Sequence, residues 1–150
     1  MRYIFLLGFL LLFHNTSSQD IKETNGLYYI NGDLFSGTFT QTDDEGNVTA
    51  RLRIRNGRPH GKSDFYHGNG SVKEIRSYRN GLKHGTWEKF NKEGLIISTA
   101  RYRNDHKHGT WQIWDDNGTL RYSLKYNRGE KTGTWKMWDE KGVLISSKTY

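Results

Sequence analysis

The chain contains the stretch Tyr102-Arg-Asn-Asp-His-Lys-His-Gly-Thr-Trp111, and 24 residues earlier the nearly identical stretch Tyr78-Arg-Asn-Gly-Leu-Lys-His-Gly-Thr-Trp87. The glycine of this stretch recurs every 24 residues, at Gly37, Gly61, Gly85, Gly109 and Gly133. A second glycine follows nine residues after each of these, at Gly46, Gly70, Gly94, Gly118 and Gly142. Positions that keep one period over most of a chain indicate tandem copies of one structural unit. We therefore predict five tandem repeats over residues 37–150, preceded by a degenerate half-repeat over residues 19–36.

Three further positions of the repeat are occupied mostly by aromatic residues. Two residues after the first glycine come Phe39, Ser63, Trp87, Trp111 and Trp135. Five residues after it come Thr42, Tyr66, Phe90, Trp114 and Trp138. Seventeen residues after it come Ile54, Tyr78, Tyr102, Tyr126 and Tyr150. Large aromatic side chains at fixed repeat positions usually pack on their counterparts in neighbouring units.

Each unit has the pattern of two strands separated by turns. In the fourth unit a short segment, 109–114, meets the turn Asp115-Asp-Asn-Gly118, and a longer segment, 119–127, returns. Residues 51–55 alternate basic and apolar side chains, which is typical of a strand with two different faces. The turns between units hold Asn-Gly pairs or Arg128-Gly129, which suit tight hairpins. The sequence therefore predicts an all-β fold, an elongated single antiparallel sheet of successive β-hairpins.

Pairing across the turn of the fourth unit assigns side chains to the two faces of the sheet. The expected cross-strand pairs are Trp114–Thr119, Ile113–Leu120 and Trp111–Tyr122. They put on the first face Trp111, Ile113, Leu120, Leu124 and Tyr126. Over all repeats that face becomes the structural repeat core, formed by Trp87, Trp111, Trp135, Tyr78, Tyr102 and Tyr126, with Tyr150 at its end. The second face combines cations with aromatic rings and supplies the candidate binding residues Arg53, Arg55, Arg79, Arg101, Arg103, Lys125, Phe90, Trp114 and Trp138.

The pattern Gly-x-Trp-x-x-Trp/Phe-x-x-x-Gly, with Tyr-x-Asn-Gly-x-x-His-Gly between units, resembles the MORN repeat, and specifically the bacterial MORN-variant proteins. The resemblance covers residues 26–150 and departs at Phe39, Ser63 and Asp105. It implies an elongated sheet of hairpins that serves protein–protein contact or binds acidic phospholipid. Some bacterial relatives are labelled antitoxins.

Residues 1–18 have the three parts of a secretory signal peptide. Arg2 gives a short positive start, residues 3–13 form an apolar run, and small polar residues follow up to Ser18. The apolar run of 11 residues is shorter than the span of about 20 that a membrane-crossing helix needs. We expect cleavage after Ser18, with an uncleaved anchor as the alternative. The expected location is the bacterial periplasm, the outer envelope or the medium, and the mature chain should have no transmembrane span.

Composition limits the chemistry of the chain. A length of 150 residues suggests one domain at most, and the absence of cysteine excludes disulfides, thiolate metal sites and a cysteine nucleophile. The formal net charge is +7. His60, His84 and His108 recur with the repeat, but equivalent positions of successive two-strand units lie about 9.5 Å apart, which is too far for one metal ion. We therefore expect no metal site and no cofactor.

The sequence also offers little support for catalysis. No serine lies in a Gly-x-Ser-x-Gly turn, and the acidic pairs fall at hairpin tips, where solvated turn residues are expected. We therefore predict a non-catalytic, exported scaffold that binds another protein. One alternative is an adhesion module that docks on anionic phospholipid or acidic polysaccharide through its basic, aromatic face, and another is an inhibitor or immunity protein for an exported toxin. A nucleic-acid partner is not expected for an exported protein.

Overall fold

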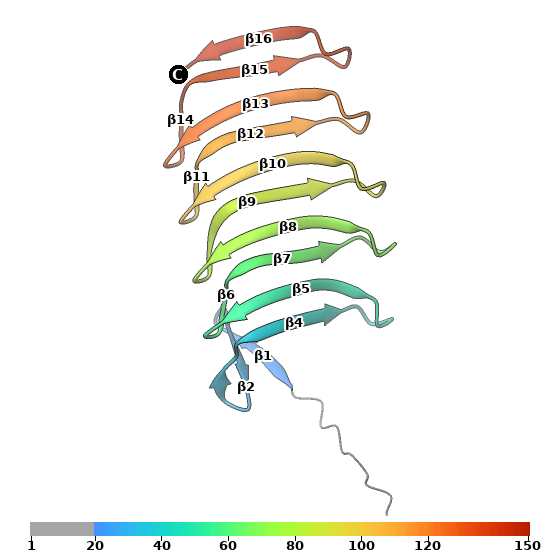
Figure 1. The fold of residues 1–150 in the computed structure, drawn as a ribbon, viewed down its shortest axis with the longest axis vertical. Helices are drawn as coiled ribbons and strands as arrows, with labels where there is room; N and C mark the ends of the chain where they lie inside the picture. The colour runs from blue at the N-terminus through green and yellow to red at the C-terminus, as the bar shows by residue number, and fades with distance from the viewer. Residues whose placement is uncertain (1–19) are drawn as a thin grey trace, which may run out of the picture.

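A computed structural model describes residues 20–150 as an all-β array of hairpins, and this confirms the predicted fold class (Figure 1). The larger of two sheets has 13 strands. Its hairpins are formed by β4 (Gly37–Thr42), β5 (Val48–Arg55), β7 (Gly61–Tyr66), β8 (Val72–Arg79), β9 (Leu82–Phe90), β10 (Ile96–Arg103), β12 (Gly109–Trp114), β13 (Leu120–Asn127), β15 (Thr134–Trp138) and β16 (Leu144–Thr149). Two-residue strands extend the turns between units at β6 (Arg58–Pro59), β11 (His106–Lys107) and β14 (Glu130–Lys131).

The signal peptide predicted for residues 1–18 lies outside the described residues. Among the residues that the structure does describe, no helix is long and apolar enough to cross a membrane.

The turns between units are two-residue hairpin loops, as the sequence predicted. Arg55 pairs with Arg58 across the first of them, so Asn56 and Gly57 form the loop, with φ values of 48° and 70°. Positive φ at both central positions is the mark of the type I′ turn, whose twist matches that of the strands it joins. The same loop recurs at residues 80–81, 104–105 and 128–129.

The turns within units share a different hydrogen-bond pattern. The carbonyl of Asp115 accepts the N–H of Gly118, and its Oδ1 accepts the N–H of Asn117 and of Thr119. The side chains of Asp43, Asn91 and Asp139 also accept backbone N–H groups in their turns. In Asp43 the hydrogen bonds from the backbone and side chain of Asn47 lower the pKa below its ordinary value. These tip residues therefore act in turn formation.

The predicted strand register was wrong by one residue, because β13 contains a β-bulge. Trp114 lies opposite Leu120, while Ile113 lies opposite Tyr122 and Trp111 opposite Leu124, so Arg121 is an extra residue in β13. Every hairpin of the array has this irregularity next to its tip. The bulge moves Leu120 to the face of Trp114, whereas Tyr122 stays on the first face and lies opposite Ile113.

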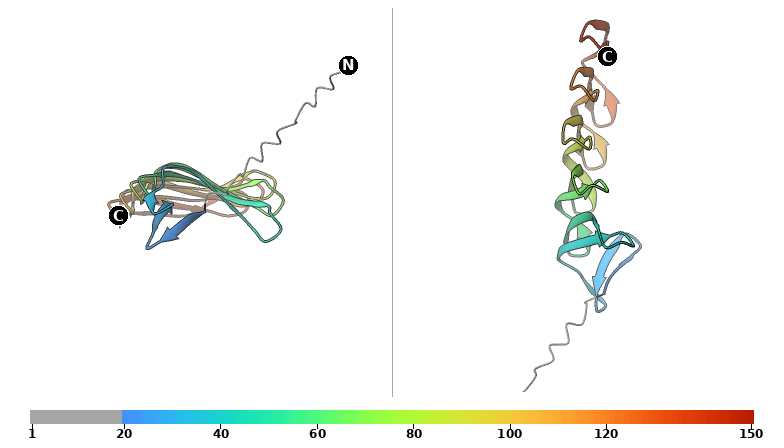
Figure 2. Two further views of the ribbon diagram at one scale, coloured as in Figure 1. Left: turned by 90° about the horizontal axis from the view of Figure 1, so that it is seen from below. Right: turned by 90° about the vertical axis from the view of Figure 1, so that its right-hand side faces the viewer.

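A second sheet of three strands, β1 (Ile21–Thr24), β2 (Leu27–Ile30) and β3 (Asp33–Leu34), packs on one side of the array near β4 and β5 (Figure 2). Tyr28 of β2 and Phe35, which follows β3, pack against the buried side chains Ala50, Leu52 and Ile54. The contact is tight, because a Cβ on Gly57 would lie 2.6 Å from Leu34 Cδ2. The predicted single sheet did not include this second sheet. The prediction that residues 19–36 form a degenerate half-repeat stays a prediction.

Candidate binding surfaces

The first face of the sheet carries a continuous ladder of aromatic rings. Tyrosine and tryptophan alternate along it, and consecutive ring centroids lie 5.0–5.4 Å apart in the order Tyr78, Trp87, Tyr102, Trp111, Tyr126, Trp135 and Tyr150. The interplanar angles of 54–63° are those of tilted and edge-on pairs, which stabilise beyond the area they bury. The residues predicted as the structural repeat core therefore form one row.

Each tryptophan of the ladder also ties two units together. Trp111 Nε1 donates to the carbonyl of Arg101 at 3.0 Å, and Trp87 and Trp135 make the same bond to Ser77 and Lys125. In the second unit Ser63 replaces the tryptophan, is fully buried, and accepts the N–H of Arg53 with its Oγ. The smaller side chain thus keeps a hydrogen bond between the two units, but here the side chain accepts and the backbone donates.

Three lysines each lie over two rings of the ladder, and the sequence analysis missed them. Lys107 Nζ lies 4.8 Å from the ring centroid of Trp111 and 4.9 Å from that of Tyr126. Lys83 and Lys131 bridge the corresponding pairs of rings in their units. Their 24-residue spacing was visible in the sequence, but it assigns no partner to the ammonium group. Lys148 lies 4.9 Å from the ring centroid of Tyr150 and Arg76 lies 5.2 Å from that of Trp87, so cation–π contacts commit five positive charges to the ladder.

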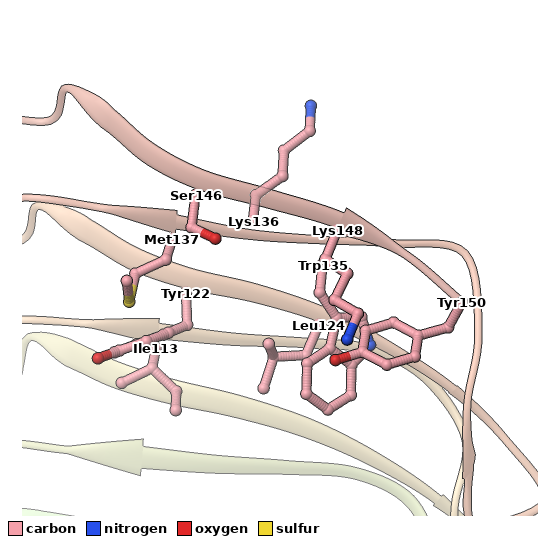
Figure 3. Close-up of a pocket in the computed structure, with 9 residues that line it drawn as sticks. All are labelled: Ile113, Tyr122, Leu124, Trp135, Lys136, Met137, Ser146, Lys148 and Tyr150. Atoms are coloured by element: carbon pink, nitrogen blue, oxygen red, sulfur yellow. The ribbon is translucent and has the colours of Figure 1, made fainter.

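An apolar hollow lies beside the ladder over β12, β13, β15 and β16 (Figure 3). It has a volume of about 420 Å³, and its floor is formed by Ile113, Tyr122, Leu124, Trp135 and Met137. Ile113 and Tyr122 are each 38% exposed. In Figure 3 Lys136 points away from these side chains, so the hollow belongs to the first face only.

The two ends of the first face differ in what covers them. Near β5 the equivalent rows contain Ala50 and Leu52, which are buried under Tyr28 and Phe35. At β12–β16 no described element lies over Ile113 and Tyr122. Exposed apolar side chains gathered in a hollow are typical of a surface that binds a partner.

The predicted basic face separates into two rows. Arg53, Arg101 and Lys125 form a mid-sheet row, which lies two residues inside the strand ends, and each side chain extends over the first glycine of the next unit. At the third of these contacts a Cβ on Gly133 would lie 3.0 Å from Lys125 Cδ. The other row is formed at the strand ends beside the type I′ turns, by Arg55, Arg79 and Arg103.

The aromatic residues of that face lie apart from both basic rows. Phe90, Trp114 and Trp138 come at the bulged ends of their strands. Trp114 is four residues along β12 from Thr110, which faces Lys125, a distance of about 13 Å at the rise of a β-strand. Cations outside the two basic rows lie nearer to these aromatic residues. Arg51 lies 5.7 Å from the Tyr66 ring centroid, and Arg121 Nε donates to the carbonyl of Trp138.

The described part of the chain, residues 20–150, contains no group of three or more His, Asp or Glu side chains placed to hold a metal ion. On the first face Arg76 and Glu74 form an ion pair, and the Arg76 guanidinium also lies over the Phe65 ring at 4.0 Å. Burial acts to lower the pKa of Arg76, but the hydrogen bond and charge of Glu74 outweigh it and raise that pKa. Arg76 is therefore held in an ion pair that packs between units.

Three segments of the chain, residues 59–80, 107–128 and 131–150, match the model of the MORN repeat variant. No curated protein matches the sequence. Among solved structures, the crystal structure of a GtfA/B complex bound to UDP and GlcNAc is similar to 87% of this chain at 13% sequence identity, with a TM-score of 0.30. This chain spans 23% of the matched chain.

Proposed function

We propose that the protein is an exported, non-catalytic repeat scaffold that binds another protein through the apolar hollow of its first face. The observation that supports this proposal best is the exposure of Ile113 and Tyr122 in a concave, mostly apolar surface. Apolar and aromatic anchors in such a hollow provide most of the free energy of a typical protein interface. The three matches to the MORN repeat variant agree with a binding module, since such repeats occur in interaction proteins.

The non-catalytic part of the proposal rests on what the polar side chains do. The carboxylates at the hairpin tips accept backbone N–H groups, as in Asp43, Asp115 and Asp139. General acid–base catalysis needs a group whose pKa is brought near neutrality by burial or by a charged neighbour. The tip carboxylates instead work as turn residues. Export is proposed from the apolar segment of residues 3–13 and the polar residues after it.

The test is capture of a partner by two double variants of the immobilised protein. I113S/Y122S removes apolar area from the hollow, while L95S/I96S removes comparable area at a hairpin tip, where the two side chains are 49% and 41% exposed. The wild type and L95S/I96S should retain the same protein in stoichiometric amount through a high-salt wash, because apolar interfaces are weakly screened. I113S/Y122S should lose it. Equal retention by both variants would exclude the hollow as the binding surface.

A further inference from the structure

The turn edge of the sheet, where successive units join, is hollowed into two grooves lined by cations. The first has a volume of about 690 Å³ and is lined by Arg55, Arg58 and Arg79 with His60. The second has a volume of about 360 Å³ and is lined by Arg103, His106 and Arg128. No carboxylate lines either groove.

The two grooves lie at equivalent positions of the repeat, two units apart. Arg55 and Arg103 are 48 residues apart, and so are Arg58 and His106. A further arginine comes from different positions, Arg79 in the first groove and Arg128 in the second. The first groove thus contains four basic side chains and the second contains three, although not all from the same repeat positions, and packing of the turns does not require this.

A line of arginines connects the grooves. Arg55, Arg79 and Arg103 hold one repeat position, so they follow one another at about 9.5 Å, twice the spacing between strands. All three are exposed, and within residues 20–150 none of them lies in an ion pair. Of the carboxylates near these turns, Asp105 accepts the N–H of Lys83 at 2.7 Å, and Glu130 faces Asn127.

We propose that this turn edge binds a linear acidic polysaccharide, whose carboxylate or sulfate groups pair with the successive arginines. A row of single cations at a regular spacing fits a chain that carries charge at intervals along its length. Asparagine amides lie between the cations, Asn56 and Asn80 in the first groove and Asn104 in the second, and they can donate hydrogen bonds to sugar hydroxyls. No Phe, Tyr or Trp ring lines the grooves, so they lack the large platforms on which nucleic-acid bases usually stack. This site is separate from the apolar hollow and is proposed in addition to the protein partner.

The experiment compares two triple variants of the purified full-length chain that remove the same charge from one face of the sheet. R55S/R79S/R103S removes the row at the turn edge, and R53S/R101S/K125S removes the row in the middle of the sheet. Binding is measured by calorimetry with polygalacturonate, which carries carboxylates, and with heparin, which carries sulfates. Vesicles that contain phosphatidylglycerol serve as the membrane probe, and the thermal midpoint of each variant checks its folding.

The proposal expects the wild type to bind at least one of the two polysaccharides with an affinity that falls as salt is added. The turn-edge variant should bind it at least tenfold more weakly, and the mid-sheet variant less than threefold more weakly. Equal losses in both variants would mean that net charge alone attracts the polymer, and this would overturn the proposal. Binding to vesicles without binding to either polysaccharide, or no binding to any probe, would also overturn it. Because none of these residues lies in the apolar hollow, either result leaves capture of the protein partner unaffected.

Discussion

His84 Nδ1 lies 3.0 Å from the side-chain oxygen of Asn104, which belongs to the next turn of the array. His60 and Asn80 make the same contact one unit earlier, at 3.3 Å. In the following unit the asparagine is replaced by Arg128, and within the described residues the buried Nδ1 of His108 has no hydrogen-bond partner. The histidine of this junction is thus hydrogen-bonded to an asparagine in two copies and lacks that partner in the third.

Arg128→Asn should stabilise the protein. The amide oxygen would reach His108 Nδ1, and such a hydrogen bond contributes about 0.5–1.5 kcal/mol. Asn also tolerates the positive φ of 50° at this position better than Arg does. Chemical denaturation should show a higher free energy of unfolding, and the reverse change, Asn104→Arg, should lower it by a similar amount. A loss of stability in Arg128→Asn would refute the comparison of the junctions.

Removing a ring from the middle of the ladder should cost more than removing one from the opposite face of the same strand. Trp111→Ala abolishes two ring contacts and the hydrogen bond to Arg101, and we expect a loss of about 3 kcal/mol. Trp114→Ala is the matched control on β12 and should cost about 1 kcal/mol. Urea unfolding of both variants checks this difference. Equal losses would show that the ladder is not the main contact between units.

Lys107→Gln should weaken the array through its rings alone. The ammonium group lies over Trp111 and Tyr126, and a cation–π contact at an exposed site contributes about 0.5–1 kcal/mol. Lys136→Gln, which removes the same charge from the second face, should change the free energy of unfolding by less than about 0.5 kcal/mol. If the two variants unfold at the same urea concentration, the lysine does not contribute to the ladder.

Stability should fall at alkaline pH because of Tyr102 in the ladder. Burial raises the pKa of Tyr102 above its ordinary value of 10.0, so the folded protein holds this proton more tightly than the unfolded chain does. The resulting stabilisation is complete below pH 10 and is lost as the pH rises through the folded pKa. Free energies of unfolding measured across this range should decline more steeply for the wild type than for Tyr102→Phe. Parallel curves for the two proteins would show that Tyr102 does not titrate differently on folding.

The period of 24 residues was enough to predict the all-β array, because glycines at fixed spacing define the turns and alternation defines the strands. The register within each hairpin was not predictable in this way. A bulge adds one residue to one strand, and neither Leu120 nor Arg121 has a side chain that marks it.

The candidate site was predicted only in part. Two-residue alternation correctly put Arg53, Arg55 and Trp114 on one face, but it does not record distance along the strand, so it did not separate the basic rows from the aromatic row. The apolar hollow was also missed. Its exposure depends on where the second sheet folds back, and residues 21–34 carry no signal that says which repeats they will cover.

Site-directed photocrosslinking can show whether a partner protein binds in the apolar hollow. A benzophenone amino acid replaces Tyr122 in the hollow in one protein and Ile96, which is 41% exposed on the opposite face, in another. After irradiation in an extract of the source cells, we expect one crosslinked protein from position 122 and none from position 96. The same product from both positions, or a product from position 96 alone, would contradict this expectation.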